Sequence, residues 1–154
     1  MHRDLAFGLA ARLTTDRDLA EEVLLDAFAS AWSGLPGFRS DSGFGTWVCG
    51  IVVNRAREAL RRRGRDGLRV ETSVEELASV GGAWADAASH TEDRIDLERA
   101  ISALPPGARE ALLLRHVYGF SCAEAADVME VSVGTVKSQT SRACALLREK
   151  LSHD

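Results

Sequence analysis

The stretch "FSCAEAADVMEVSVGTVKSQTSRACALLREKL", residues 120–151, contains the signals of two helices joined by a tight turn. Ser121 and Glu124 form an S-x-x-E capping box, which satisfies free backbone groups at the start of a short apolar helix. Ser132 is suited to cap a second helix, and the residues around Glu130–Val131 leave room only for a short turn. Two helices in this arrangement predict a helix-turn-helix, whose second helix enters the major groove of DNA.

The second of these helices combines an apolar face with many side-chain hydrogen-bond donors. Val133 and Val136 are expected to pack against Ala126 and Met129 of the first helix. The other side chains are then available to DNA, because Lys and Arg donate to guanine and Gln pairs with adenine. The candidate DNA contacts are Thr135, Lys137, Ser138, Gln139 and Arg142. For this helix taken alone, a solvated face of an ordinary helical bundle is the alternative interpretation.

The first third of the chain predicts two long helices. Thr15 is suited to cap the first, which has a wide apolar stripe along Leu19–Trp32. The Gly, Pro, Ser and Asp residues that follow Trp32 favour turns, so a loop is expected there. The second helix is expected from about Phe44 to about Arg63, and it becomes strongly basic in its last third.

The middle of the chain predicts a linker followed by more helices. Residues 64–92 lack sustained periodicity and are rich in glycine and acidic residues, with a helical turn expected around Val74–Ala78. Pro105–Pro106 separates two further helices, and Gly119 fits the C-terminal cap of the second. No strand pattern is present, so the predicted fold is all-α, with two small helical domains joined by a flexible acidic linker.

Charge is distributed unevenly along the chain. The formal net charge of −4 argues mildly against tight DNA binding by the protein alone. Residues 54–70, however, contain seven arginines against two acidic residues, and residues 71–98 contain eight acidic residues against one arginine. The arginine run follows Phe38, Phe44 and Trp47, and aromatic side chains beside arginines suit stacking on unpaired bases. A solvated helix end is the alternative interpretation.

Composition argues against several classes of protein. The apolar runs are too short to span a membrane and no signal peptide is recognisable, which predicts a cytoplasmic protein. Cys49, Cys122 and Cys144 are too widely spaced for a zinc knuckle or a disulfide framework. The four histidines are scattered and no phosphate-binding glycine loop is present. We therefore expect no enzyme activity, no metal and no cofactor.

The chain as a whole resembles the extracytoplasmic-function sigma factors, small bacterial transcription initiation factors with two helical domains. "DRDLAEEVLLDAFASAW" is similar to the helix that docks on the RNA polymerase clamp, and "FRSDSGFGTWVCGIVVNRAREALRRR" to the reader of the promoter −10 element. "LPPGAREALLLRHVYGFSCAEAADVMEVSVGTVKSQTSRACALLRE" is similar to the −35 domain. The resemblance implies a −10 domain at 1–65, a linker at 66–92 and a −35 domain at 93–154. It also implies binding to core RNA polymerase, promoter DNA and an anti-sigma factor, with no membrane and no small-molecule substrate.

The same resemblance implies roles for single residues. In the family, a loop receives a flipped-out −10 base, and Phe38 and Asn54 match the residues around it. The implied −10 set is Phe38, Asn54, Arg57, Arg61 and Arg62. Lys137, Ser138 and Arg142 match the −35 contacts. The implied polymerase contacts are Glu22, Asp26 and Phe28.

Some positions depart from the family pattern. Leu25–Asp26 stands where Gln-Glu is usual, and Gly45 and Cys49 stand where larger side chains are usual. Glu130 replaces the turn glycine, which costs about 1 kcal/mol if the residue adopts a left-handed conformation. Members usually have roughly one more helix before the position of Met1, so we expect an incomplete first domain whose apolar stripe is partly uncovered.

Two other functions remain open from the sequence. One is a helix-turn-helix transcription regulator that does not dock on the polymerase clamp, and the other is a sigma-like decoy that binds an anti-sigma factor. Leu25 and the short N-terminus favour the regulator, whereas the loop "GFRSDSGFGTW" has no use in such a protein.

Overall fold

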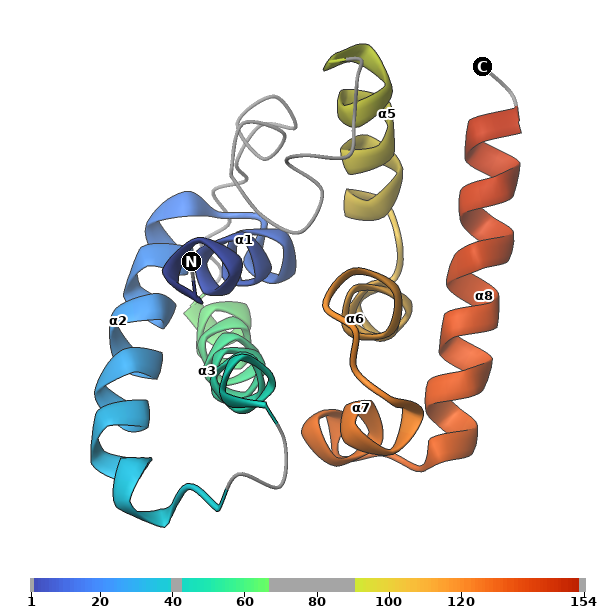
Figure 1. The fold of residues 1–154 in the computed structure, drawn as a ribbon. Coiled ribbons are helices and arrows are strands. Elements are labelled where there is room, and N and C mark those ends of the chain that lie inside the picture. Colours follow the sequence, from blue (N-terminus) through green and yellow to red (C-terminus); the bar gives the residue numbers. More distant parts are fainter. Residues whose placement is uncertain (1, 40–42, 67–90, 153–154) are drawn as a thin grey trace.

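The structure, a computed structural model, describes residues 2–39, 43–66 and 91–152 of the chain. Every regular element in these ranges is helical and none is a strand, so the predicted all-α fold is confirmed (Figure 1). The N-terminal half consists of α1 (His2–Thr14), α2 (Arg17–Gly34), the short η1 (Leu35–Gly37) and α3 (Phe44–Asp66). The C-terminal half consists of α5 (Thr91–Ser102), α6 (Pro106–Leu112), η2 (Leu113–Val117), α7 (Cys122–Met129) and α8 (Val133–Ser152). The helical turn expected around Val74–Ala78 lies outside the described residues.

Asp16 caps α2, so the prediction of Thr15 as the cap is wrong. The Asp16 carboxylate accepts a hydrogen bond from the Leu19 backbone N–H at 3.1 Å, and it also pairs with the Arg63 guanidinium of α3. Thr15 instead adopts a left-handed conformation, with φ 53°, in the turn between α1 and α2. Burial by itself would raise the pKa of Asp16, but the Arg63 and backbone hydrogen bonds outweigh it and lower that pKa. The cap therefore also ties the start of α2 to α3.

The helices of the N-terminal half pack through small and branched side chains. Residues of α2 such as Leu19, Val23 and Ala27 are buried and belong to the same cluster as Leu9 of α1 and Val52 of α3. In Figure 1, α1 and α2 lie on two sides of α3. The predicted stripe is thus buried along most of α2, and α1 and α3 supply the partners that it needs.

The stripe does not continue to Trp32, contrary to the prediction. Trp32 is 81% exposed at the end of α2, while Ala31 beside it is buried. The small Ala27 and Ala31 already fill the contact with the neighbouring helices. Trp32 follows Ala31 and lies one position further round the helix, so its ring points outward.

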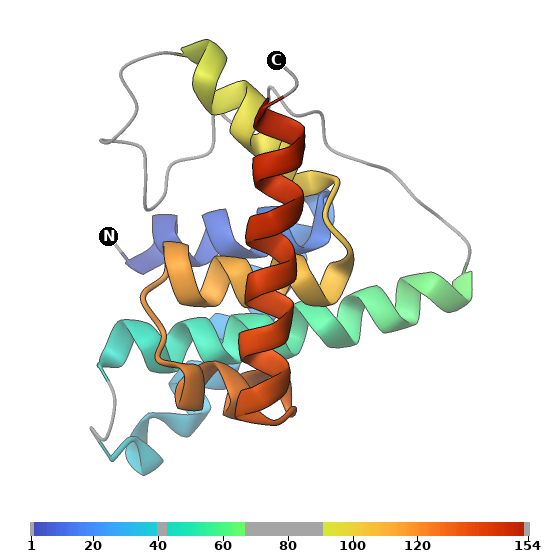
Figure 2. The same cartoon turned by 90° about the vertical axis from the view of Figure 1, so that its right-hand side faces the viewer.

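The C-terminal half is built around the crossing of α6 by α8, which Figure 2 shows face-on. The helix that starts at Pro106 continues from α6 into the π-helical segment η2, and Gly119, with φ 73°, follows its end as predicted. Arg109 donates to the carbonyl oxygens of Ser102 at 2.9 Å and Leu104 at 3.0 Å. These bonds fix the corner between α5 and α6 that the two prolines create.

The two halves contact one another directly. The guanidinium of Arg12 on α1 donates to one carboxylate oxygen of Glu98 on α5, at 2.7 and 3.0 Å, and both side chains are almost completely buried. Further along, α3 packs beside α7, where Val128 approaches Gly50. The hydrophobic core is consequently one continuous cluster with members from both halves.

Candidate nucleic-acid interface

Side-chain hydrogen bonds cap the start of α7 and the start of α8, and a tight turn joins the two helices. The Ser121 hydroxyl accepts from the Glu124 backbone N–H at 3.0 Å, and the Glu124 carboxylate accepts from the Ser121 N–H at 3.0 Å, which confirms the capping box. Glu130 ends α7 in the left-handed conformation, with φ 57° and ψ 43°. The Ser132 hydroxyl accepts from the Thr135 N–H at 3.1 Å at the start of α8. The predicted helix-turn-helix is therefore present, with α8 as its second helix.

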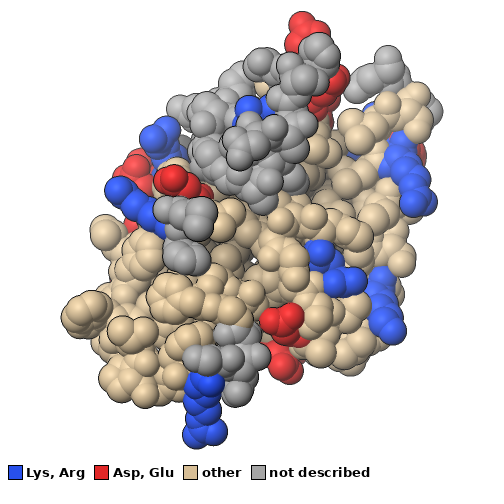
Figure 3. Space-filling model, in the orientation of Figure 1, with Lys and Arg blue, Asp and Glu red and all other residues tan. Residues whose placement is uncertain are grey.

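The first half of α8 holds several polar side chains away from the core. Val136 is fully buried, whereas Val133, which was predicted to pack against α7, is 39% exposed. Figure 3 shows Lys and Arg side chains along the right-hand edge of the molecule, over α8. Three of the five candidate DNA contacts on this helix are exposed: Lys137, Ser138 and Arg142.

The other two candidates on α8 are engaged within the protein. The Thr135 hydroxyl lies 2.9 Å from the Ser132 hydroxyl at the cap. Gln139 is half-buried against α6, so close to Gly107 that a β-carbon there would lie 3.2 Å from the Gln139 Nε2. Gln139 thus packs between helices in this structure. The sequence could not show this, because the contact depends on a glycine 32 residues earlier in the chain.

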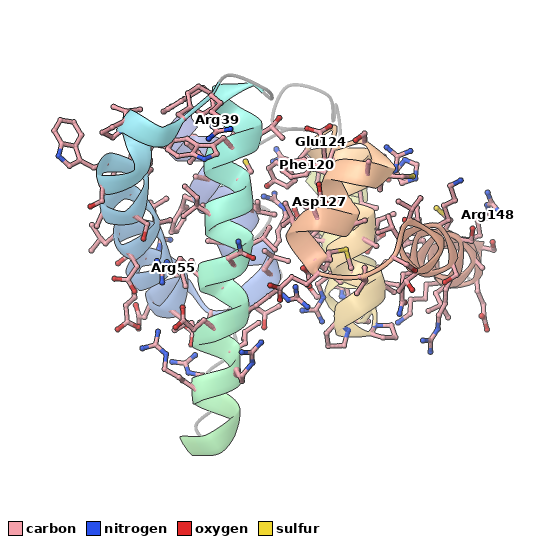
Figure 4. The ribbon with its side chains drawn as sticks, turned by 90° about the horizontal axis from the view of Figure 1, so that it is seen from below. Arg39, Arg55, Phe120, Glu124, Asp127 and Arg148 are labelled. Carbon is pink, nitrogen blue, oxygen red and sulfur yellow. The ribbon has the colours of Figure 1, made fainter. Side chains whose placement is uncertain are left out.

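Three aromatic rings gather where the loop after α2 meets the start of α3. The Phe38 ring lies 4.9 Å from the Trp47 ring and 5.8 Å from the Phe44 ring, centroid to centroid, and Phe44 and Trp47 are also 5.8 Å apart. Phe44 is 42% exposed and Arg39 beside the cluster is exposed (Figure 4). A solvent-accessible aromatic cluster with a neighbouring cation can stack on unpaired bases. Arg39 was missed by the sequence analysis, although its position next to Phe38 was a usable signal.

Beyond this cluster, α3 continues with exposed polar and basic side chains. Asn54 follows Trp47 by seven residues, and Arg61 follows Asn54 by seven, so the three lie on one face of the helix. Asn54, Arg61 and Arg62 are all exposed. The helix rise places Asn54 about 10 Å from Trp47 along the axis, which separates it from direct contact with the aromatic cluster.

Arg57, the remaining −10 candidate, is held by the C-terminal half. Its guanidinium donates to the carbonyl oxygen of Met129 at 2.6 Å and of Val128 at 3.4 Å, the last carbonyls of α7. Its Nε also lies 3.7 Å from the carboxylate of Glu110, which is buried in α6. Burial raises the pKa of Glu110, and the charge of Arg57 partly offsets that rise. An arginine at the C-terminus of a helix is favourable because it satisfies free carbonyls and complements the helix dipole.

Other arginines of the basic run also have partners inside the N-terminal half. Arg63 pairs with the cap residue Asp16, and Arg55 donates to the Ser30 hydroxyl at 2.8 Å, between α2 and α3 (Figure 4). The run is therefore divided between internal and outward-facing side chains. Counting charges in the sequence could not reveal that division, because it depends on which helix faces each arginine.

The outer face of α2 carries the predicted polymerase contacts. Glu22 and Asp26 are exposed and Phe28 is half-buried. The structure adds two apolar side chains to this face, since Leu25 is 71% exposed and Trp32 81%. The positions of Leu25, Phe28 and Trp32 at spacings of three and four place them on one side of the helix.

A cavity of about 290 Å³ lies between α1, α3 and the segment η2–Phe120. Gly45 and Cys49 contribute to its wall from α3, and Val117, Tyr118 and Phe120 from the C-terminal half. Burial raises the pKa of the Cys49 thiol to about 11, so the thiol is uncharged near neutral pH. Gly45 has no side chain and that of Cys49 is small, so neither residue fills the space.

The described part of the chain offers neither a metal site nor a membrane-spanning helix. Its His, Cys, Asp and Glu side chains nowhere form a group of three or more that could hold a metal ion. None of its helices is both long enough and apolar enough to cross a membrane.

Both ends of the chain match known protein domains. Residues 1–66 match the family described as Sigma-70 region 2, and residues 94–147 match Sigma-70, region 4. A helix-turn-helix with exposed cations on its second helix, joined to a helical domain with an aromatic and basic face, is thus the architecture of a sigma-70 transcription factor.

Comparison with relatives and with a solved structure shows to which branch of the sigma-70 family the chain belongs. The chain is 35% identical over 144 residues to the RNA polymerase sigma-H factor of Pseudomonas aeruginosa, covering 88% of this chain and 75% of that protein. It is 35% identical over 145 residues to the ECF RNA polymerase sigma factor SigM of Mycobacterium tuberculosis, covering 93% and 70%. The sigma factor RpoE from Bartonella quintana, solved in complex with the anti-sigma factor NepR, superposes with a TM-score of 0.76 at 28% identity, covering 97% of this chain and 91% of that one. The chain belongs to the extracytoplasmic-function sigma factors of the sigma-70 family.

Proposed function

We propose that this sigma factor docks on core RNA polymerase through the outer face of α2 and recognises promoter DNA at two separate surfaces. The aromatic cluster and α3 contact the −10 element, and α8 contacts the −35 element. The corresponding domains are residues 1–65 and 93–154, with a linker at 66–92. The factor binds and positions DNA without catalysing a reaction and without a cofactor, and it acts in the cytoplasm, where polymerase and promoter meet.

The single observation that carries this proposal is the outward face of α8. Lys137, Ser138 and Arg142 are exposed, while Val136 on the opposite side is fully buried. A helix anchored in this way keeps its donors in a fixed orientation, which base contacts in the major groove require. Arg148, farther along α8, points away from the other helices and can add a phosphate contact (Figure 4).

The assignment of the −10 surface is supported by an exposed aromatic ring that lies next to a positively charged side chain. The exposed Phe44 ring and the neighbouring Arg39 offer contact to an unpaired base and its phosphate. Asn54 and Arg61 continue the same surface along α3. Phe38, whose ring lies against both other rings, would hold the cluster in shape and form one wall of a base pocket.

An anti-sigma factor is the second partner in this proposal. The RpoE structure that resembles this chain was solved with such a partner. The exposed Leu25 and Trp32 on α2 support the idea that this face is covered by another protein when the factor is engaged.

Run-off transcription with purified core polymerase, with and without this protein, tests the proposal. We expect promoter-specific transcripts only when the protein is present, and loss of those transcripts with a Lys137→Ala/Arg142→Ala double variant. Lys150→Ala, which removes an exposed cation near the far end of the same helix, is the matched control and should retain activity. Specific nanomolar binding to duplex DNA without polymerase, and no transcript with it, would instead identify a simple regulator.

A further inference from the structure

Gln139 was predicted to contact DNA, but its amide group lies against α6 instead. A β-carbon on Gly107 would lie 3.2 Å from the Gln139 Nε2, 3.5 Å from its Cδ and 3.8 Å from its Oε1. The whole amide group therefore covers the bare backbone of Gly107. The crossing of α6 by α8 that Figure 2 shows is what brings the two residues together.

Shape, and not hydrogen bonding of the amide oxygen, favours this position of Gln139. Its Oε1 is buried, and it has no hydrogen-bond partner in the described part of the chain. A buried carbonyl oxygen without a partner is destabilising, and it regains hydrogen bonds when it reaches water or DNA. The inward position of the amide thus depends on the free space above Gly107.

The backbone of α6 gives no reason for a glycine at position 107. Gly107 is the second residue of α6, after Pro106, and its φ lies outside the left-handed region. Residues with a β-carbon have a higher helix propensity than glycine. The contact with Gln139, in contrast, uses the missing side chain directly.

Gln139 borders the face of α8 that we assign to the −35 element. Ser138 precedes it, Arg142 follows it by three positions, and both of these side chains are exposed. A Gln139 side chain turned away from α6 would join this face, where glutamine can pair with adenine through two hydrogen bonds.

We propose that Gly107 determines part of the −35 specificity of this protein, because it keeps the Gln139 amide away from promoter DNA. With glycine at this position, Lys137, Ser138 and Arg142 read the −35 element without Gln139. A larger residue at position 107 turns the amide outward and adds a contact with adenine. This inference rests on the proposed −35 function of α8.

The position of Gln139 is tested first, in the absence of DNA. In the full-length protein, the side-chain amide protons of Gln139 should give nuclear Overhauser effects to the Hα protons of Gly107. Their absence would overturn the proposal, whatever the protein does on a promoter.

Base preference tests the consequence for recognition. Competition among −35 duplexes for the polymerase complex is measured for wild type, Gln139→Ala, Gly107→Val and the double variant. Wild type and Gln139→Ala should share one base preference. Gly107→Val should gain a preference of about fivefold for adenine at one position, the lower end of what a bidentate pair contributes, and the double variant should lose that gain. Gly64→Val is the matched control, since a β-carbon on this exposed glycine of α3 meets no atom within 4 Å, and it should bind as wild type does.

Three results would contradict the proposal. A changed base preference in Gln139→Ala would show that Gln139 already contacts DNA in the wild type. A gain in Gly107→Val that persists in the double variant would not pass through Gln139, and an unchanged preference in a folded Gly107→Val protein would exclude the proposed role of Gly107. If Gly107→Val loses helical content, the smaller Gly107→Ala replaces it in the same set of variants, with a smaller gain expected. Run-off transcription by wild type is measured separately, so failure of this inference and failure of the sigma function are distinguishable.

Discussion

Replacement of Glu130 by glycine should stabilise the protein, because Glu130 is a non-glycine residue in a left-handed conformation. Its φ of 57° and ψ of 43° place it at the C-terminal cap of α7. The left-handed conformation costs a residue with a β-carbon about 1–2 kcal/mol. Glycine avoids that cost, but its greater conformational freedom in the unfolded chain reduces the gain in stability by about 0.5–1 kcal/mol. With the middle value of each range, the net expected gain for Glu130→Gly is about 0.75 kcal/mol.

Thermal unfolding followed by circular dichroism would measure this gain. For a chain of this length, about 1 kcal/mol corresponds to a rise of about 2–4 °C in Tm. Glu130→Ala is the matched control, since it removes the same carboxylate but retains the β-carbon and therefore the strain. A rise of equal size in both variants would show that charge, and not backbone conformation, is responsible. No rise with glycine would refute the reasoning about strain at this turn.

Three further outcomes are expected. Lys137→Ala should weaken binding of the polymerase complex to a −35 duplex by about 1–3 kcal/mol if the contact is bidentate to a base, as measured by competition of labelled promoter fragments. Phe38→Ala and Asn54→Ala should reduce promoter opening, seen as lower permanganate reactivity of −10 thymines, while −35 binding is retained; normal opening by both would contradict the pocket assignment. Because the folded-state pKa of Asp16 is lowered, its carboxylate adds stability above the usual pKa near 3.8, and that stability is lost as pH falls through the lowered value. Urea titrations between neutral and acidic pH should therefore show a smaller decrease in stability for Asp16→Asn than for wild type.

Local sequence signals predicted the helix-turn-helix well. The Ser121–Glu124 capping box, the Ser132 cap and the left-handed turn at Glu130 all involve residues within a few positions of one another. Such features depend on short-range hydrogen bonding and backbone sterics, which a sequence shows directly. The prediction of Gly119 at the C-terminus of a helix rests on the same kind of local signal.

Predictions failed or stayed incomplete where the answer depended on a distant helix. Thr15 and Asp16 are both acceptable caps by residue type, and the pairing of Asp16 with Arg63 on α3 favours the second. Trp32 belongs to an apolar stripe by spacing, yet the packing of α2 leaves it exposed. The inward position of Gln139 against Gly107 likewise follows from the crossing of α6 and α8.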